Sequence, residues 1–165
     1  MWLMPPDPIA EAHRQWVAHG WADAADGMAA ITSLMRAQQI VLARVEAVLK
    51  PHGITFARYE VLMLLYFSRR HSLPMTFIGE RLQVHPTSVT NAVDRLQTAA
   101  LVRRAPHPHD RRSTIVELLP AGREVAEAAT ADLNDQVFGA PWIEPTAIND
   151  LVEVITQIRR QADDF

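Results

Sequence analysis

The 165-residue chain is long enough for one sizeable hydrophobic core, and its 48% hydrophobic and 21% charged residues are typical of a folded soluble protein. It contains no cysteine, which excludes disulfides, thiolate metal sites and cysteine nucleophiles. Its net charge of −3 hides an uneven distribution: residues 51–119 carry nine Lys and Arg against five Asp and Glu, whereas residues 120–165 carry three against nine.

The first residues contain no basic segment followed by an apolar run, so we expect no secretory signal. Nowhere is an apolar stretch long enough to cross a bilayer. The expected protein is therefore cytoplasmic and has no membrane partner.

The first 50 residues predict two helices after an irregular, proline-rich start that runs through Pro8. A helical pattern begins near Ile9, weakens at Gly20 and resumes at about Asp23. The second helix should stop at Pro51, because proline cannot continue the backbone hydrogen bonds of a helix. Its broad apolar stripe is formed by Met28, Ile31, Met35, Leu42, Val45 and Leu49, with Leu34, Val41 and Val48 beside it.

Thr55 is suited to cap the next helix, because a threonine hydroxyl can accept a hydrogen bond from a free backbone N–H of the first turn. This helix, FARYEVLMLLYFSRR over residues 56–70, is apolar on several sides, so we expect it at the centre of the core. The following segment, HSLP over residues 71–74, is polar and predicts a simple connection.

From Thr76 onward the pattern predicts a short helix, a tight turn at Val84 and a second helix. Pro86 suits the first position of the second helix, where its missing N–H leaves no hydrogen bond unmade. The apolar residues that should face the core are Phe77, Ile78 and Leu82 in the first helix and Val89, Val93 and Leu96 in the second.

The outward face of the second helix carries small polar and basic side chains that suit a helix in the major groove of DNA. Asparagine can form two hydrogen bonds with adenine, Ser and Thr can contact base edges or phosphates, and arginine can pair with guanine or phosphate. Structural alternatives stay open: Thr87 or Ser88 could only cap the helix, and Arg95 could only pair with Asp94 or Glu80. The candidate DNA-binding residues of this helix are Pro86, Thr87, Ser88, Thr90, Asn91 and Arg95.

A basic hairpin follows, with a strand from Leu101 to Arg104, a tip over residues 106–113 and a return strand over residues 114–119. Arginine is the side chain favoured in a narrow minor groove, where the negative potential is deepest. Asp110 would bind DNA poorly, so we expect it to orient a neighbouring arginine through a charge-assisted hydrogen bond. The alternative is a solvent-exposed charged turn. The candidate DNA-binding residues of the tip are His109, Asp110, Arg111 and Arg112.

Two further helices are expected after the hairpin. The first opens at Pro120, and its pattern is broken by Gly139, Pro141 and Pro145. The last helix is strongly amphipathic, as is the long N-terminal helix, so the two could pack on each other or form a subunit interface. A symmetric dimer would suit a near-palindromic DNA site. The apolar residues of the last helix are Ile148, Leu151, Ile155 and Ile158.

The order of these segments resembles the MarR (multiple antibiotic resistance regulator) family of transcription factors, over roughly residues 28–160. The matching segments are GITFARYEVLMLL, HPTSVTNAVDRLQ, LVRR and DRRSTIVEL, the last followed by a helix that opens with AG. The wing pattern of the family, Asp-x-Arg with an aliphatic residue four places on, is met by Asp110, Arg112 and Val116.

The resemblance implies an all-α fold with a small β-wing: a winged helix-turn-helix core over residues 51–119, with dimerisation helices over residues 1–50 and 120–165. It implies a homodimer that binds double-stranded DNA and is regulated by a small ligand, often aromatic or phenolic, bound between the dimer helices and the DNA-binding lobe. We expect a repressor that this ligand releases from its operator, although the sequence itself does not distinguish repression from activation.

Two positions depart from the family pattern. Ala100 stands where the family commonly has glycine, which predicts a different helix exit, or up to about 1 kcal/mol of strain if the residue is left-handed. Leu119 replaces the usual threonine, so the following helix should lack a capping hydroxyl worth roughly 1 kcal/mol.

Other functions have weaker support in the sequence. Seven histidines permit a metal-responsive regulator, but they show no HExxH or similar spacing, and we expect no metal or cofactor. An enzyme could use His52 with Glu60, or His107 with Asp110, as general acid and base. No nucleophile elbow or phosphate loop accompanies either pair, so we expect that the protein is not an enzyme. A winged helix could also bind a protein instead of DNA.

The sequence does not identify the effector or its pocket. Aromatic and methionine side chains at helical spacing can line a pocket for an aromatic acid or its thioester, or can be ordinary core. The residues concerned are Trp16, Trp21, Met35, Arg36, His52 and Tyr59.

Overall fold

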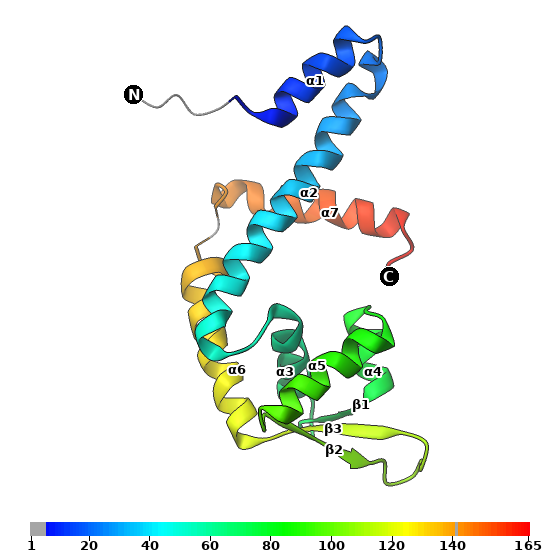
Figure 1. Cartoon of the computed structure of the whole chain (residues 1–165), viewed down its shortest axis with the longest axis vertical. Helices are drawn as coiled ribbons and strands as arrows, with labels where there is room; N and C mark the ends of the chain where they lie inside the picture. Colours follow the sequence, from blue (N-terminus) through cyan, green and yellow to red (C-terminus); the bar gives the residue numbers. More distant parts are fainter. Residues whose placement is uncertain (1–5, 141) are drawn as a thin grey trace. The chain divides into compact units, whose positions relative to one another are not determined.

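The computed structural model describes residues 6–140 and 142–165, which belong to two compact units divided between Ala47 and Val48. The first unit contains α1 (Pro8–Ala18) and most of α2 (Ala22–Leu49), whose last two residues belong to the second unit. The second unit contains, in chain order, the 3₁₀ turn η1 (Lys50–His52), α3 (Phe56–Phe67), β1 (Ser72–Pro74), α4 (Met75–Leu82), α5 (Pro86–Thr98), β2 (Val102–Pro106), β3 (Thr114–Leu118), α6 (Pro120–Leu133), the π-helical turn η2 (Asn134–Phe138), the 3₁₀ turn η3 (Pro145–Ala147) and α7 (Ile148–Gln161) (Figure 1).

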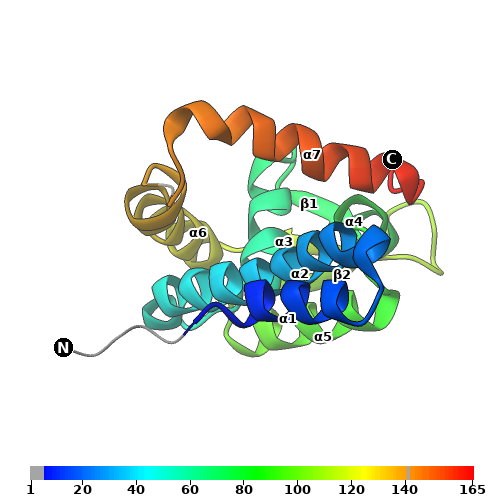
Figure 2. The same cartoon turned by 90° about the horizontal axis from the view of Figure 1, so that it is seen from above.

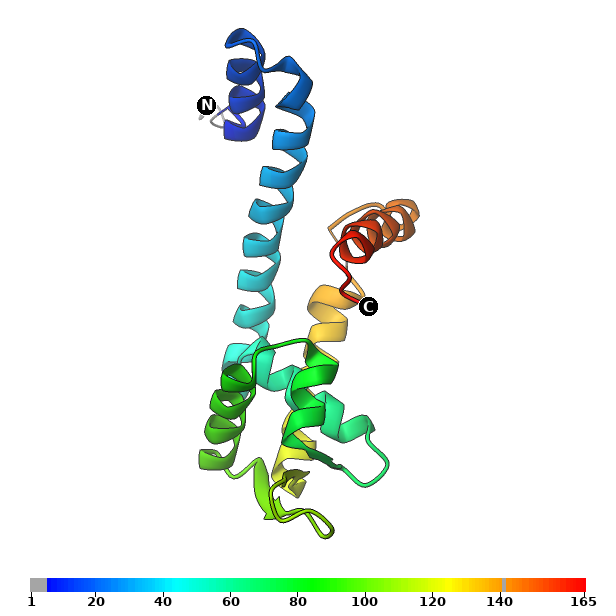
Figure 3. The same cartoon turned by 90° about the vertical axis from the view of Figure 1, so that its right-hand side faces the viewer.

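In the first unit, α1 turns back beside the first turns of α2 (Figure 3). Pro8 is not part of an irregular start, because the Asp7 side chain accepts a hydrogen bond from the backbone N–H of Ile9 and opens α1 at Pro8. Gly20, with φ of +83°, makes the turn that separates the helices, as the break in the sequence pattern predicted. A hydrogen bond of 2.7 Å between His13 and Asp26 joins the two helices.

The start of the second unit follows the local signals of the sequence. The chain leaves α2 through Pro51, and Gly53 adopts a left-handed conformation with φ of +72°. Thr55 caps α3, its hydroxyl oxygen accepting a hydrogen bond from the N–H of Arg58 at 3.3 Å. The helix ends at Phe67, three residues before the predicted end.

The small sheet has three antiparallel strands in the order β1–β3–β2. The hairpin is confirmed: Val102 pairs with Leu118, and the ladder continues to the pairing of Pro106 with Thr114. The prediction of a simple connection at HSLP was wrong, because Ser72–Pro74 forms β1 and pairs with the distant strand β3. A three-residue edge strand is too short to show an alternating pattern, so its pairing partner decides its conformation.

The core of the second unit is built around α3, which contacts α4, α5, α6 and β3. Each Val, Leu or Ile side chain buried there contributes roughly 1.5–3 kcal/mol relative to an exposed one. Phe77 is an exception to the predicted core, because it is 42% exposed while Ile78 and Gly79 form the buried face of α4. The main buried apolar residues are Val61, Leu62, Leu65, Ile78, Val89, Val93, Leu96, Val102, Val116, Ala126, Ala129 and Leu133.

The joint between the recognition helix-turn-helix and α6 is made by close backbone contacts. Ala100 has a left-handed backbone with φ of +57°, so the strain expected at this position is present. A Cβ atom on Gly122 would lie 2.1 Å from the carbonyl oxygen of Leu101, which explains the glycine near the start of α6. Leu119 stands at the N-cap of α6 without a side-chain hydrogen bond, as its apolar side chain predicted.

The chain therefore has the expected mostly helical fold with a small β-wing. Figure 2 shows α7 running apart from α6 after the turns η2 and η3. None of the residues of α7 is buried. No helix in the described part of the chain is both long enough and apolar enough to cross a membrane.

Candidate nucleic-acid interface

The recognition helix α5 presents a polar outward face because its apolar face is fixed in the core. Val89, Val93 and Leu96 are buried, as predicted, and Ala92 is buried with them. All six candidate DNA-binding residues of this helix are exposed: Pro86, Thr87, Ser88, Thr90, Asn91 and Arg95.

The start of α5 is capped by a residue that was not predicted to be a cap. His85 is the N-cap, and its Nδ1 accepts a hydrogen bond of 3.1 Å from the backbone N–H of Thr87. Neither Thr87 nor Ser88 therefore acts as the cap. A proline at the first helical position could have identified His85, because the residue before it is by definition the cap.

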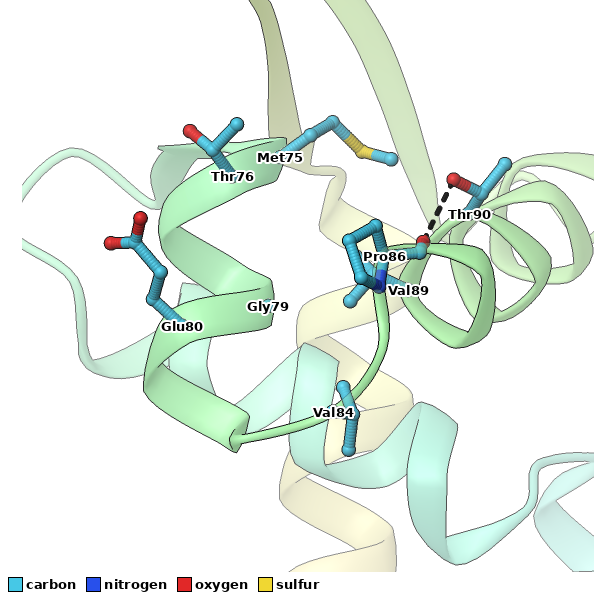
Figure 4. A pocket seen from close by; sticks show the side chains of 8 residues that line it. All are labelled: Met75, Thr76, Gly79, Glu80, Val84, Pro86, Val89 and Thr90. Carbon is cyan, nitrogen blue, oxygen red and sulfur yellow. Dashed lines mark hydrogen bonds between the residues drawn. The ribbon is translucent and has the colours of Figure 1, made fainter. Parts of the chain in front are cut away.

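Thr90 uses its hydroxyl proton within the helix. Its Oγ1 donates a hydrogen bond of 3.0 Å to the carbonyl oxygen of Pro86 (Figure 4). In this conformation the hydroxyl can still accept a hydrogen bond from a base or another donor. Asn91 is exposed one position further along and carries both donors and an acceptor.

A shallow pocket of about 330 Å³ lies between α4 and the first turns of α5 (Figure 4). Its lining is mainly apolar, and the only carboxylate that lines it is Glu80 on α4. The pocket borders two of the candidate DNA-binding residues, Pro86 and Thr90. The residues that line it are Met75, Thr76, Gly79, Glu80, Val84, Pro86, Val89 and Thr90.

The tip of the wing is ordered by its own side chains. Nδ1 of His107 accepts a hydrogen bond of 3.1 Å from the backbone N–H of His109, and Asp110 Oδ1 accepts one of 2.9 Å from the backbone N–H of Arg112. The expected bond from Asp110 to an arginine side chain is replaced by this bond to the arginine backbone, which is the usual role of an aspartate in a tight turn. Asp110 therefore shapes the loop that carries the tip arginines.

The arginines of the wing divide into two pairs. Arg111 and Arg112 at the tip are exposed, and neither forms an ion pair with any described residue. On β2, Arg103 forms an ion pair with Glu117 of the neighbouring strand. The two tip arginines are thus the ones available to phosphates or a minor groove.

Arg104, the second arginine of β2, contacts the recognition helix. Its Nη2 lies 2.5 Å from Oδ1 of Asp94, and its Nη1 donates a hydrogen bond of 2.6 Å to Oε1 of Gln97. The alternative pairing of Arg95 with Asp94 is therefore wrong, and Arg95 forms no ion pair within the described residues. The role of Arg104 was not predicted, because nothing in the local sequence pattern indicates a contact between a strand and a helix ten residues earlier.

The residues considered for other chemistry have different partners. His52 Nε2 lies 2.6 Å from Oδ2 of Asp132 in α6. Burial raises the pKa of the Glu60 carboxyl above its ordinary value. His107 and Asp110 both accept hydrogen bonds from the backbone of the wing tip. Among the residues that the structure describes, no three His, Asp or Glu side chains lie close enough together to hold a metal ion.

The residues considered for an effector pocket are divided between the two units. In the first unit, the rings of Trp16 and Trp21 pack edge to face with centroids 5.4 Å apart. In the second, Tyr59 is buried and its hydroxyl lies 2.9 Å from Oγ1 of Thr130. The effector pocket stays a prediction.

Comparisons with known proteins agree with this architecture. A sequence model of the MarR family matches residues 52–113. The crystal structure of a MarR family transcriptional regulator from Streptomyces coelicolor is 51% identical, covers 85% of this chain and 97% of its own, and superposes with a TM-score of 0.77. A second MarR family regulator of that organism, solved in complex with DNA, has the same fold at 23% identity, with a TM-score of 0.72 over 83% of this chain and 88% of its own.

Curated relatives show the same kind of likeness over a shorter length. An uncharacterized HTH-type transcriptional regulator of Bacillus subtilis, YhbI, is 33% identical over 84 residues, which are 51% of this chain and 53% of YhbI. The chain spans about half the length of the curated relatives that it matches.

Proposed function

The chain belongs to the MarR family of transcriptional regulators, and on this basis we propose that it is a homodimeric repressor of near-palindromic duplex DNA that a small ligand releases. The observation that carries the proposal is the combination of an exposed polar helix face with a wing tip whose two arginine side chains form no ion pair with any described residue. The polar helix face is what a protein needs to read bases in the major groove. The arginine-bearing tip is what it needs to bind phosphates or a minor groove.

The recognition helix would supply the base contacts. Asn91 and Arg95 lie on the outward face of α5 and carry the side chains that read adenine and guanine most specifically. Thr87 and Ser88 lie at the start of the helix, where hydroxyls and backbone N–H groups commonly bind phosphate. A regulator of the same fold was solved in complex with DNA, which supports DNA as the proposed partner.

The wing would supply a second, electrostatic contact. Arg111 and Arg112 project from a loop whose backbone is held by His107 and Asp110, so little ordering remains to be done when DNA binds. His109 lies between these two anchors and is exposed, so it can donate to a phosphate. Binding should therefore weaken steeply as the salt concentration rises.

A second copy of the chain would cover the apolar face of α7. Leu151 and Ile158 recur on this helix at a spacing of seven residues and are 46% and 44% exposed. In a two-fold symmetric dimer the two recognition helices would stand roughly 34 Å apart, one turn of DNA. The effector would be a small aromatic or phenolic ligand, the class that the family resemblance implies.

The test is to select binding sites from randomised duplex DNA and to titrate the winning site at several salt concentrations. We expect an inverted repeat with half-sites about one helical turn apart, bound by a dimer. Weak binding without sequence preference would contradict the proposal and would favour a winged helix used for protein contact. The winning site also provides the probe for an effector screen, in which an aromatic acid or its thioester should release the DNA.

A further inference from the structure

Arg104 joins the wing to the recognition helix through a pair of short contacts. It lies on β2, and its guanidinium spans Asp94 and Gln97, which are three residues apart and therefore lie on one face of α5. The planar guanidinium presents its donors in a fixed geometry, so two simultaneous partners fix its orientation. Only 28% of the Arg104 side chain is exposed, which limits competition from water.

This contact lies between the two proposed DNA-binding elements. Asp94 and Gln97 belong to the second half of α5, whereas β2 leads directly into the wing tip. Duplex DNA fixes the position of a minor groove relative to the adjacent major groove, so a protein that enters both needs its two elements at a set angle. The backbone turn at Ala100 joins α5 to β2, and the Arg104 contacts add a connection between their side chains.

Resting on the proposed DNA-binding function, we propose that Arg104 is a positioning residue, which holds the wing through Asp94 and Gln97 so that Arg112 reaches the DNA while α5 lies in the major groove. Arg104 does not contact DNA in this arrangement. It also neutralises the Asp94 carboxylate, which would otherwise repel phosphates from the face of the recognition helix.

A direct phosphate contact by Arg104 is the competing role, and the two roles predict opposite effects of Asp94→Asn. If Arg104 were a phosphate contact, removing the Asp94 charge would free it and remove a repulsive group, so DNA binding would become tighter. If Arg104 positions the wing, the same change weakens its anchor, and binding becomes weaker. The substitution is nearly isosteric and Asp94 is exposed, so the fold is retained.

The experiment measures Kd for the selected DNA site and the protection of its minor groove, for the wild type, Asp94→Asn, Arg104→Gln and Arg112→Ala, and for both double variants with Arg112→Ala. Glu80→Gln is the matched control, because it also removes one carboxylate from the helix-turn-helix but has no ion-pair partner among the described residues. Circular dichroism during heating checks that each variant is folded, and Gln97→Ala is a second way to weaken the anchor.

We expect Asp94→Asn to weaken binding about three- to tenfold and to abolish protection by the wing, while Glu80→Gln does not weaken binding. The loss caused by Arg112→Ala should shrink from about tenfold in the wild type to less than about twofold in the Asp94→Asn protein, because the wing is already misplaced. Tighter binding by Asp94→Asn, or additive losses with the wing footprint retained, would overturn the positioning role. Absence of any selected site for the wild type would instead contradict the proposed function itself.

Discussion

The recognition helix α5 and the last helix α7 are amphipathic helices of nearly equal length, 13 and 14 residues, yet they bury their apolar faces very differently. In α5, Val89, Val93 and Leu96 are almost completely buried. In α7, Leu151 and Ile158 remain nearly half exposed. An amphipathic pattern therefore predicts that a helix has a face to bury, but it does not say whether the partner is the same chain.

The difference follows from where each helix lies in the fold. The buried face of α5 packs on α3, α4 and β2, which surround it within the second unit. After α6, the chain passes through η2 and η3, and α7 has its main contacts with η3 alone. The apolar face of α7 is thus left exposed, and in the proposed dimer a second copy would cover it.

The largest contrast is expected between core truncations in the two helices. Leu96→Ala should lower the free energy of unfolding by about 2–5 kcal/mol, because Leu96 is only 1% exposed and its removal leaves a cavity. Denaturant titration measures this loss. Ile158→Ala is the matched change in α7, and its cost should depend on protein concentration if the proposed dimer buries this face. If both substitutions lowered the free energy of unfolding equally and at every protein concentration, the contrast between the two helices would be wrong.

A double charge substitution in α7 should break the proposed dimer without unfolding the winged helix. Leu151→Glu with Ile158→Glu would bury two unpaired carboxylates in the interface, and we expect dimer affinity to fall at least about 100-fold. Sedimentation velocity at micromolar concentration measures the mass, and circular dichroism monitors the fold. A variant that stays dimeric would show that α7 does not form the interface.

The outward face of α5 should respond in binding and not in stability. Asn91→Ala should cost about 1–3 kcal/mol of binding free energy at one base position and relax the base preference there, because a bidentate contact is lost.

At the wing tip, Arg112→Ala should weaken binding to all sequences and reduce the salt dependence by about one ion. Fluorescence anisotropy with matched and mismatched sites measures both. Arg69→Ala, which removes an exposed arginine outside these elements, should leave binding unchanged.

The exits of the two helices allow a smaller comparison. Ala100 follows α5 with φ of +57°, and Asp163 follows α7 with φ of +51°. Ala100→Gly should stabilise the protein by about 0.5–1 kcal/mol, because glycine adopts this conformation without a Cβ clash. Asp163→Gly should give less, since aspartate tolerates the left-handed region better than alanine. Thermal unfolding compares them, and an unchanged midpoint for Ala100→Gly would argue against strain at this exit.

The smallest effect concerns the helix that supports α5. Burial raises the pKa of Glu60 in α3 above 4.5, its ordinary value, so the folded state binds this proton more tightly than the unfolded chain does. Stability should therefore fall as the pH rises through the range above 4.5. Glu60→Gln should stabilise the protein by less than about 1 kcal/mol at pH 7 and by less still below pH 4. Urea titrations at the two pH values would detect this, and a gain that grew on acidification would contradict the sign.

Local signals in the sequence were sufficient for most of the fold. Thr55 and Pro86 mark helix starts through the chemistry of the first turn, and both helices begin where those residues predicted. The sequence did not predict strand β1, because Ser72–Pro74 becomes a strand only by pairing with residues more than 40 positions later. The same limit applies to buried faces, since the exposed Phe77 and the buried Ile78 are neighbours in an equally apolar segment.

The candidate site was predicted in outline and corrected in its contacts. The exposure of Asn91 and Arg95 followed from helical spacing, because the positions of the buried valines determine the opposite face. The roles of Asp110 and Arg104 did not follow, since each depends on a turn or a strand-to-helix contact that sequence spacing does not encode. In both places the charged side chain binds a protein group that the local pattern leaves unspecified.

Successive side chains of β2 lie on opposite faces of the sheet, and this alternation decides the direction in which the wing points. Arg103 pairs across the hairpin with Glu117, whereas Arg104, on the opposite face, contacts α5. The β2–β3 pairing ends at Pro106 and Thr114, so the tip residues 107–113 lie beyond it, whereas a slip of one residue within β2 would exchange the two faces. The register of β2 therefore decides which of its two arginines faces the recognition helix, and with it the direction in which the wing leaves the sheet.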